Sequence, residues 1–507
     1  MTPAEVVLAI DLGTTATKVA AVDNDFHVLF STEAANPMIT GGSAASGGAT
    51  AVHDPETVLS AAISAARDCV GECARRGVHV AALSFSAAMH TLLALDHEHR
   101  PLTPALSWAD ARASGVSARL RAEEDGELHR RLHAVTGTPV HPMSPLVKLA
   151  WFAEHEPALH RDAAVWCGLK DYVLHAFTGS LVIDTSCASG SGLLDIHTRA
   201  WNADSLEIAG IGPTRLPPPA DPLEHRPLVP DIAARLGLPV GLPVIVGAGD
   251  GPLANLGAGA AAPGSAALSI GTSAALRVTR DTPGIDAECR TFCYALADGL
   301  WTQGGAVSNG GLVANWAADT TGRTDIGALL TEASGLPPDF DGLIALPYLL
   351  AERAPHWAPE PRAVLLGLRH DHGAAAITRA FVDGVALQLA AVHESIRSAG
   401  VHLATIHATG GALRAPLWPN VIAAAFDAPL TVTHGQAGSA GSARGAAILG
   451  WRALGAIGHL SQVPELKGDV IYPDPRIRAR LAGMRELHDL AFETATRAAR
   501  IKGLASP

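Results

Sequence analysis

Two strand–turn–strand segments, about half a chain length apart, constrain the fold more than any other feature of this sequence. In the first, between Val6 and Val22, the apolar run VVLAI leads into the turn DLGTT and then into KVAAV. In the second, between Ala266 and Val278, ALSI leads into GTS and then into AALRV. Two apolar runs around a short glycine turn predict a β-hairpin. Either tripeptide alone is common in plain turns, but the repetition favours a duplicated body.

The chain length also favours two domains. The sequence has 507 residues, and a single hydrophobic core stops growing at roughly 250–300 residues. Prolines crowd the segment from Gly210 to Pro243, which excludes a long helix or a central strand there. We interpret this segment as a surface connection and expect an N-terminal domain over 1–243 and a C-terminal domain over 244–507.

Helix and strand signals alternate in both halves, which is typical of an α/β fold. Asp54 and Pro55 predict a helix start, apolar residues recur at helical spacing, and Gly77 ends the run before the strand VHVAALSF. In the second half, an apolar stripe from Ile377 to Ile396 predicts a helix, followed by the strand TIHAT and the helix LWPNVIAAAF. The charged tail after Pro475 is interpreted as a packed or solvated helix.

Composition argues against several partners and compartments. The net charge is −12, which repels nucleic acid and anionic membranes, and 48% hydrophobic residues argue against global disorder. The six cysteines are too dispersed for a disulfide framework. The N-terminal segment MTPAEVVLAIDLG lacks the basic region of a signal peptide. We therefore expect a cytoplasmic protein with no nucleic-acid and no membrane partner.

The glycine turns predict phosphate binding of an unusual kind. Glycine turns with small hydroxyl neighbours offer backbone N–H donors to phosphates. Neither a GxxxxGK[ST] loop nor a GxGxxG between strand and helix occurs, so P-loop and Rossmann designs lack their signatures. Asp11 precedes the first turn, where one carboxylate can hold a hydrated Mg²⁺, although it also suits a turn cap. Lys18 follows the turn and is either a phosphate contact or a solvated strand-edge lysine.

One acid stands alone in an apolar stretch. Asp250 lies in IVGAGDGPLANLG, within a segment otherwise uncharged from Leu242 to Leu276. A carboxylate after a buried strand is a natural general base for an alcohol, and a helix cap is the alternative.

Polar groups near turns in the first half suit sugar hydroxyls. They are His90 in SFSAAMHTLLAL and Trp108, Asp110 and Arg112 in SWADAR. Asp110 and Arg112 could equally pair with each other. The histidines show no HExxH motif, and Cys69/Cys73 and Cys289/Cys293 lack zinc-spaced partners, so we interpret these cysteines as packed thiols.

Taken in order along the chain, these motifs resemble those of the FGGY carbohydrate kinases, a branch of the actin-like ATPases. AIDLGTTATK looks like the family's first phosphate motif, MSPLVKLAWFAEH like its first signature, GAGDG like its base motif and ALSIGTS like its second phosphate motif. GGLVANW and ATGGALRAPLWPNVIAAAFD resemble its adenosine segment and second signature. The resemblance runs from about Val6 to about Gly450.

The resemblance implies two ribonuclease-H-like (actin-like ATPase) domains flanking a catalytic cleft. It implies that Asp250 deprotonates a sugar hydroxyl, which attacks the γ-phosphorus of ATP, with Mg²⁺ beside Asp11. The implied ATP contacts are Gly13, Thr14, Thr15, Lys18, Gly271, Thr272, Ser273, Gly311, Asn315, Gly410 and Gly411. The implied sugar contacts are Met89, His90, Asp110, Arg112, Lys148 and Asp250.

Within the family, SFSAAMHTLLALD, LTPALSWADARA, TGTPVHPMSPLVKL and DTSCASGSGLLDIHT look most like segments of gluconate kinases. This implies ATP-dependent phosphorylation of D-gluconate to 6-phosphogluconate. The substrate carboxylate would need a cation, and four residues are open candidates: Arg112, Lys148, His90 and Lys170.

Two alternatives stay open. Xylulose kinases share the Met-His pair and the ERxP segment, here Glu352 to Pro355, so xylulose or another polyol is the second substrate class. An actin-like nucleotide switch without sugar turnover also uses two such hairpins, but MSPLVKLAW and Met89-His90 argue against it. The expected partners are a small sugar acid and ATP, and a homodimer is open because α/β domains of this kind often pair through exposed apolar faces.

Overall fold

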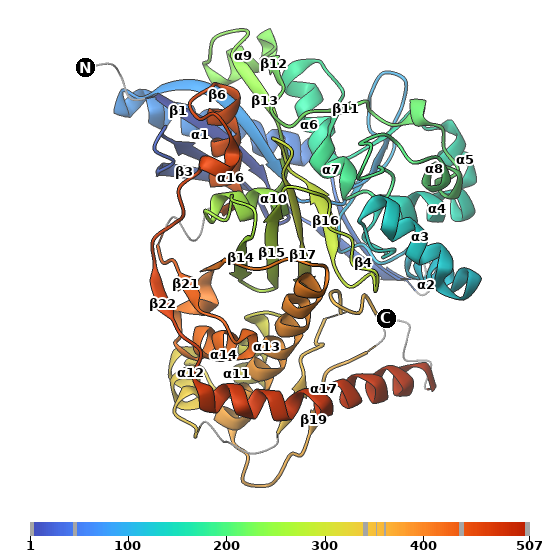
Figure 1. The fold of residues 1–507 in the computed structure, drawn as a ribbon. Helices are drawn as coiled ribbons and strands as arrows, with labels where there is room; N and C mark the ends of the chain where they lie inside the picture. Colours follow the sequence, from blue (N-terminus) through green and yellow to red (C-terminus); the bar gives the residue numbers. More distant parts are fainter. Residues whose placement is uncertain are drawn as a thin grey trace. The chain divides into compact units, whose positions relative to one another are not determined.

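The described chain forms two compact units. The structure, a computed structural model, describes residues 5–43, 48–337, 343–350, 352–358, 361–435 and 441–501 (Figure 1), so the first four residues of the N-terminal segment discussed above lie outside it. Unit 1 comprises Met1–Pro263, Thr279–Gln303 and Ala440–Pro464; unit 2 comprises Gly264–Val278, Gly304–Ser439 and Glu465–Pro507. Both units combine sheets with helices, which confirms the predicted α/β class. The units are interleaved along the chain and differ from the sequence halves that meet at Pro243.

Unit 1 is built on a six-stranded sheet. In order across the sheet, its strands are β12 (His225–Pro227), β13 (Pro243–Gly249), β6 (His79–Ala87), β1 (Glu5–Leu12), β2 (Ala16–Val22) and β3 (Val28–Ala35). Strands β13, β6 and β1 are parallel, and β1, β2 and β3 pair antiparallel. The first predicted hairpin is therefore confirmed, with Asp11 opposite Lys18 in its register.

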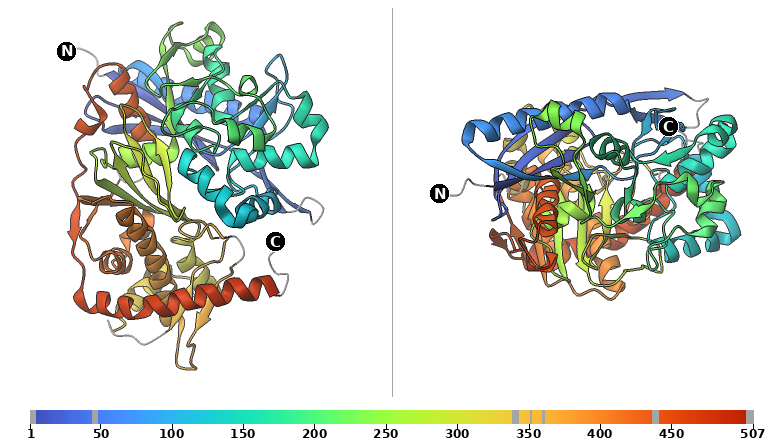
Figure 2. Two further views of the ribbon diagram at one scale, coloured as in Figure 1. Left: turned by 45° about the vertical axis from the view of Figure 1, so that its right-hand side comes forward. Right: turned by 90° about the horizontal axis from the view of Figure 1, so that it is seen from above.

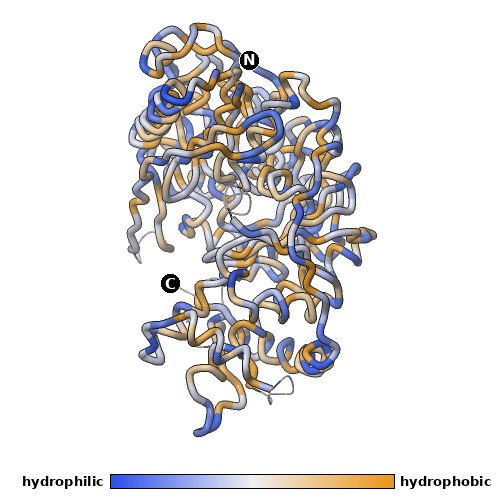
Figure 3. The backbone as a smooth tube through the Cα atoms, turned by 90° about the vertical axis from the view of Figure 1, so that its left-hand side faces the viewer, coloured by the Kyte–Doolittle hydropathy of each residue, from blue (hydrophilic) through white to orange (hydrophobic). Residues whose placement is uncertain are grey.

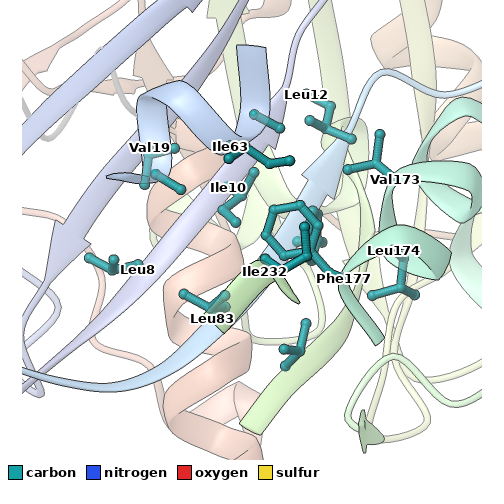
Figure 4. Close-up of a cluster of buried hydrophobic side chains, with 14 of the residues drawn as sticks. Leu8, Ile10, Leu12, Val19, Ile63, Leu83, Val173, Leu174, Phe177 and Ile232 are labelled. Carbon is teal, nitrogen blue, oxygen red and sulfur yellow. The ribbon is translucent and has the colours of Figure 1, made fainter. Parts of the chain in front are cut away.

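Helices cover both faces of this sheet, and successive residues of β1 point alternately to the two cores. Leu8 and Ile10 pack with helices α1 (Pro55–Arg76), α6 (Leu169–Thr178) and α9 (Pro230–Leu236), as Figure 4 shows for this cluster. Val7 and Ala9 pack with helices α10 (Asp250–Gly257) and α16 (Gly441–Ala453). Helix α1 begins and ends as predicted, because Asp54 caps its start and Gly77 leaves it with φ 64°.

A second core in unit 1 lies among shorter elements and contains Trp151, Phe152 and Trp166. The remaining elements of unit 1 are β4 (Ile39–Ser43), β5 (Gly48–His53), β7 (Leu93–Leu95), β8 (Ala105–Leu106), α2 (Ser114–Ala122), η2 (Glu123–Gly126), α3 (Glu127–Thr136), α4 (Pro145–His155), α5 (Pro157–Asp162), β9 (Val165–Cys167), β10 (Ile183–Asp184), α7 (Thr185–Ser189), α8 (Ala203–Ala209), η3 (Pro213–Arg215), β11 (Pro219–Ala220), β16 (Phe292–Ala295) and η5 (Leu460–Gln462).

The proline-rich segment from Gly210 to Pro243 differs from a simple surface connection. As expected, it holds only short elements, and its strand β12 is at a sheet edge. However, Ile232 and Leu236 of α9 are buried in the core of unit 1. Proline limits the length of regular structure but does not prevent a short helix from burying an apolar face.

Unit 2 carries the larger part of a seven-stranded sheet. Its order is β16, β17 (Trp301–Val307), β15 (Ala274–Arg280), β14 (Ser265–Ile270), β20 (Thr405–Thr409), β21 (Leu430–Val432) and β22 (Asp469–Ile471). The second predicted hairpin is confirmed, because β14 and β15 pair antiparallel. The other elements are α11 (Leu312–Thr320), α12 (Ile326–Ser334), β18 (Ile344–Leu346), β19 (Val364–Leu366), α13 (Ala374–Ser398), η4 (Gly411–Arg414), α14 (Leu417–Phe426) and α17 (Pro475–Ile501).

Helix α13 is the central helix of unit 2. It packs on α11, α12 and α14, and α17 runs beside α13 and α14 (Figure 2). Among the described helices, α13 alone is long and apolar enough to cross a membrane by length and composition, and 83% of its apolar window is buried inside the protein. Hydrophobic and hydrophilic residues are interspersed along the chain in both units (Figure 3), which is typical of elements that bury one face.

Candidate active site

The turn of the first hairpin is tight and closed by its own backbone. The Gly13 N–H donates to the Ala16 carbonyl at 3.1 Å, and the Asn36 side chain donates to the Gly13 carbonyl at 2.8 Å. A Cβ on Gly13 would lie 2.8 Å from the Ala16 oxygen, so the turn requires glycine. Thr14 accepts a hydrogen bond from the Trp108 indole at 3.0 Å. Thr15 and Lys18 are exposed, as a ligand contact requires.

Asp11, at the end of β1, has one oxygen held and one left open. Its Oδ2 accepts a hydrogen bond from the Ser442 hydroxyl at 2.7 Å. Its Oδ1 is buried and has no hydrogen-bond partner within the part of the chain that the structure describes. No three His, Cys, Asp or Glu side chains gather at one point among these residues. An oriented carboxylate with one unsatisfied oxygen fits a hydrated Mg²⁺ held beside phosphates, because that ion needs only one or two protein carboxylates.

Asp250 is the first residue of α10, directly after β13. Gly249 precedes it with extended backbone, and the Gly249 N–H donates to the Ser186 hydroxyl at 3.3 Å. A Cβ on Gly249 would lie 2.6 Å from Cγ of Met89, so Met89 packs closely against the residue next to Asp250. The helix start favours a negative charge at this position. The structure thus places Met89 of the predicted sugar site against Gly249, the residue that precedes Asp250.

His90 is held in an uncommon backbone conformation with φ 67°. Its Nδ1 lies 2.9 Å from the Gly190 carbonyl, and because a carbonyl can only accept, Nδ1 carries the proton. Nε2 then faces the Tyr294 hydroxyl at 3.4 Å, and the two rings meet edge to face. Met89 also packs against Gly190, because a Cβ on Gly190 would lie 2.5 Å from Cε of Met89.

Asp110 and Arg112 pair with each other, which was one of the two interpretations of this motif. The guanidinium donates to both carboxylate oxygens at 2.8 and 2.9 Å, and Asp110 also accepts from the Ala51 N–H at 2.9 Å. Arg112 lies over the Trp151 ring, 5.2 Å from its centroid. The Asp110 side chain is fully buried, whereas that of Arg112 is 14% exposed. Asp110 therefore fixes the orientation of Arg112.

Lys148 is fully buried on α4 and ties two turns together. Its ammonium donates to the carbonyls of His90 at 2.6 Å and of Ser107 at 2.8 Å. Burial lowers the pKa of Lys148 to about 7, and the nearby Asp110 acts in the opposite direction. The ammonium is thus used to hold the backbone of the turns that carry His90 and Trp108.

Two small cavities lie beside these residues in unit 1. One of about 40 Å³ is lined by Met89, His90, Lys170, Asp171 and Cys187 among others. One of about 10 Å³ is lined by Gly13, Thr14 and Trp108 among others. Ala88 and Thr91 line both cavities, so the predicted first phosphate turn and the predicted sugar residues lie in one region of unit 1.

In unit 2, the second glycine hairpin gathers most of the other predicted residues. The Gly310 and Gly311 N–H groups donate to the Thr272 and Gly271 carbonyls at 3.0 and 2.8 Å. Gly410 has φ 119°, and a Cβ there would lie 2.2 Å from the Ile270 oxygen. Glycine is therefore required for this close approach.

The remaining predicted residues of unit 2 are open to solvent. Thr272, Ser273, Asn315 and Gly411 are exposed. A Cβ on Gly411 would meet no atom within 4 Å. The two groups of predicted ligand residues thus divide between the units, with the sugar and first phosphate residues on unit 1 and the others on unit 2.

Models of one known protein family match both parts of the chain. The model of the N-terminal domain of the FGGY family of carbohydrate kinases matches residues 6–257, and that of the C-terminal domain matches residues 266–454. The chain belongs to the FGGY family of carbohydrate kinases.

Similar FGGY proteins cover nearly the whole chain. The gluconokinase of Bacillus subtilis (strain 168) is 33% identical over 485 residues, covering 92% of this chain and 91% of its own. The crystal structures of a gluconate kinase and of a ligand-bound xylulose kinase, both from Lactobacillus acidophilus, each have a TM-score of 0.88 and 30% identity and cover 98% of both chains. The expected two-domain kinase fold is confirmed by these likenesses.

Sequence reasoning missed three residues that contact the predicted site residues or their neighbours. Ser442 bonds Asp11, Ser186 bonds Gly249, and Tyr294 faces His90. Their only sequence signal was a small or hydroxyl residue inside GSARG, DTSCAS and FCYA, which is too common to single out. Each contact joins segments that are distant in sequence.

Proposed function

We propose that this FGGY kinase transfers the γ-phosphoryl group of ATP to the 6-hydroxyl of D-gluconate, forming 6-phosphogluconate and ADP. The observation that carries the proposal is the 33% identity to a gluconokinase over 92% of this chain. The site residues of unit 1 support it, because Met89 and His90 line one cavity and Met89 packs against Gly249, the residue before Asp250.

Asp250 is the proposed general base. Its carboxylate accepts the proton of the sugar hydroxyl as that oxygen attacks the γ-phosphorus and the bond to the β-phosphate oxygen breaks. Mg²⁺ beside Asp11 would neutralise charge on the phosphate oxygens. The proposed phosphate contacts are Gly13, Thr14, Thr15, Lys18, Gly271, Thr272 and Ser273, and the proposed adenosine contacts are Gly311, Asn315, Gly410 and Gly411.

The substrate carboxylate needs a cation, and the contacts of the four candidate residues favour some of them over others. Lys148 uses its ammonium on two carbonyls, and Lys170 pairs with Asp184. Of the other two, Arg112 is the better candidate for the carboxylate, because its guanidinium has N–H groups besides the two that donate to Asp110. His90 already uses its Nδ1 proton on the Gly190 carbonyl, so it would bind a carboxylate only with Nε2 protonated as well. Arg112 is held by Asp110 and partly exposed, which suits a preorganised contact. Met89, Asp110 and Lys148 then shape the sugar site.

The test is ADP release by the purified protein with Mg²⁺-ATP and gluconate, xylulose, ribulose, glycerol or no sugar. We expect gluconate to stimulate release most. Asp250→Asn should lower kcat by about 10²–10⁴-fold, the usual contribution of a general base. Asp231→Asn, an exposed aspartate of α9 in the same unit, is the matched control and should keep full activity. A folded Asp250→Asn protein with wild-type kcat would overturn the assigned base.

Xylulose is the second candidate substrate, because the xylulose kinase structure matches this chain as well as the gluconate kinase structure does. Preferential stimulation by xylulose would replace the substrate and keep the mechanism. Sugar-independent release with nucleotide-dependent partner binding would instead favour a nucleotide switch.

All six cysteines are free thiols, which supports the cytoplasm as the proposed compartment.

A further inference from the structure

A buried ion pair lies close to the segment that leads into Asp250. The Lys170 ammonium, on the first turn of α6, is 2.7 Å from Oδ2 of Asp184, and the two side chains are 3% and 0% exposed. Burial alone would lower the pKa of Lys170, but the nearby carboxylate of Asp184 outweighs burial and raises that pKa. The two partners of the ion pair are thus buried together inside unit 1.

Lys170 contacts β13 at a point where the pairing of this strand with β6 is irregular. The register of β13 against β6 shifts between Ile245 and Ala248. Gly247 has φ 79°, and a Cβ there would lie 1.8 Å from the Phe85 carbonyl oxygen. Such a bulge leaves backbone groups outside the strand ladder, and each needs another partner when buried. Lys170 supplies one, because its ammonium donates to the Val246 carbonyl at 2.8 Å.

Asp184 is connected to the same segment, the end of β13, through helix α7. Oδ1 of Asp184 accepts the Cys187 N–H at 2.7 Å and so caps the start of this short helix. Within α7, the Ser186 hydroxyl accepts the Gly249 N–H at 3.3 Å. The two partners of one ion pair thus lead to Val246 and Gly249, four residues and one residue before Asp250.

We propose that Lys170 and Asp184 are positioning residues for Asp250. Lys170 fixes the bulge of β13 and Asp184 fixes α7, so that the strand ends with the carboxylate of Asp250 in one orientation. This inference rests on the proposed role of Asp250 as the base. The proposal also means that Lys170 does not bind the substrate, because its buried ammonium already contacts the Asp184 carboxylate and the Val246 carbonyl.

The test compares Lys170→Met, Asp184→Asn and the double variant, with kcat, both KM values and the urea midpoint measured for each. Lys170→Met should lower the urea midpoint, because it leaves the Asp184 charge buried and unpaired. It should also lower kcat at least tenfold, with the KM values for ATP and the sugar within twofold. The double variant removes the unpaired charge, so its urea midpoint should recover while its kcat stays low.

The matched control is Arg452→Met/Asp298→Asn, which removes another ion pair of unit 1 with bonds of 2.8 and 3.0 Å. Its kcat should stay within twofold of wild type. Hydrogen exchange gives a second readout: the peptide spanning β13 and the start of α10 should exchange faster in the Lys170 variants and not in the control.

Three results would overturn the inference. Recovery of kcat together with stability in the double variant would reduce Lys170 to a counter-ion. A raised KM for the sugar with unchanged kcat would make Lys170 a substrate contact. Wild-type kcat in Asp250→Asn would remove the base itself, and with it both proposals. When Asp250→Asn is inactive and the double variant is active, only the positioning role falls.

Discussion

The Ser442 hydroxyl donates a 2.7 Å hydrogen bond to Oδ2 of Asp11, although 431 positions separate the two residues in the sequence. Ser442 lies in the first turn of α16, and Asp11 lies at the end of β1. The bond fixes the carboxylate so that its other oxygen stays unpaired among the described residues. Helix α16 thereby contributes to the proposed metal position.

Ser442→Ala should raise the Mg²⁺ concentration that gives half-maximal activity by about tenfold. A hydrogen bond to a charged group is worth roughly 1.5–3 kcal/mol, and part of this is recovered by water. Ser442→Thr keeps the hydroxyl and is the matched control. Mn²⁺ binding to each protein with ATP, followed by electron paramagnetic resonance, measures the same change without turnover. Equal Mn²⁺ affinity in all three proteins would contradict the role of Ser442.

Lys148→Met should raise the KM for the sugar about tenfold with a smaller effect on kcat. The change leaves the His90 and Ser107 carbonyls without their donor, so the two turns lose their fixed spacing. Each buried carbonyl left unpaired costs about 1–3 kcal/mol of stability. Steady-state kinetics and urea unfolding measure the two effects, with the exposed Lys467→Met as control. An unchanged sugar KM in a destabilised protein would show that Lys148 serves folding only.

Gly445→Ala should destabilise the protein by more than about 2 kcal/mol, within the range of severe overpacking. A Cβ at Gly445 would lie 2.0 Å from the Leu253 carbonyl oxygen, so α16 could not approach α10. Gly483→Ala on α17 is the matched control, because a Cβ there meets no atom within 4 Å. Helix propensity predicts that this control is stabilised by about 0.5–1 kcal/mol. Equal effects in urea unfolding would show that the helix contact does not require glycine.

Asp171 should make stability fall as the pH rises. Burial raises the pKa of Asp171 to about 7, with Asp184 adding to the effect and Lys170 opposing it. Between the ordinary pKa of an aspartate and about 7, the folded state binds the proton more tightly than the unfolded state, so the free energy of unfolding decreases with pH across this window. When the pKa values of the folded and unfolded states differ by one, the free energy of unfolding changes by roughly 1.4 kcal/mol.

Asp171→Asn removes this titration and keeps an oxygen that can accept the Gly168 N–H. The variant should therefore be more stable than wild type at pH 8, by roughly 2–4 kcal/mol, with a much smaller difference at pH 4. Urea unfolding at several pH values measures this. A constant difference across that range would show that Asp171 is ionised in the folded protein throughout.

Local patterns were sufficient for much of the fold. The two hairpins, the helix between Asp54 and Gly77 and the helix containing Ile377 to Ile396 follow from periodicity, caps and glycine turns, which depend on neighbouring residues. The interleaving of the units could not be read in this way. It depends on helix–helix approaches such as Gly445 against Leu253, between segments far apart in the sequence.

Local sequence patterns likewise predict only part of the candidate site. Asp250 and Asp11 stand out by residue type and position beside glycine turns. The partners of Lys148 and Lys170 are mainly backbone carbonyls, which every residue carries, so the sequence could not distinguish these buried ammonium groups from ligand contacts. The Asp110–Arg112 pair was one of two open interpretations, and only the geometry selects it.

The return of residues Ala440–Pro464 to unit 1 also has a consequence for biosynthesis. Helix α16 covers part of the face of the first sheet that contains Val7 and Ala9. This apolar face is therefore incomplete until the ribosome has synthesised the part of unit 2 that precedes α16 in the sequence. At roughly 5–20 residues per second, the delay is on the order of 10–30 s. The nascent N-terminal portion must therefore wait for its last helix, and a gene fragment ending at Pro243 should yield an aggregating polypeptide.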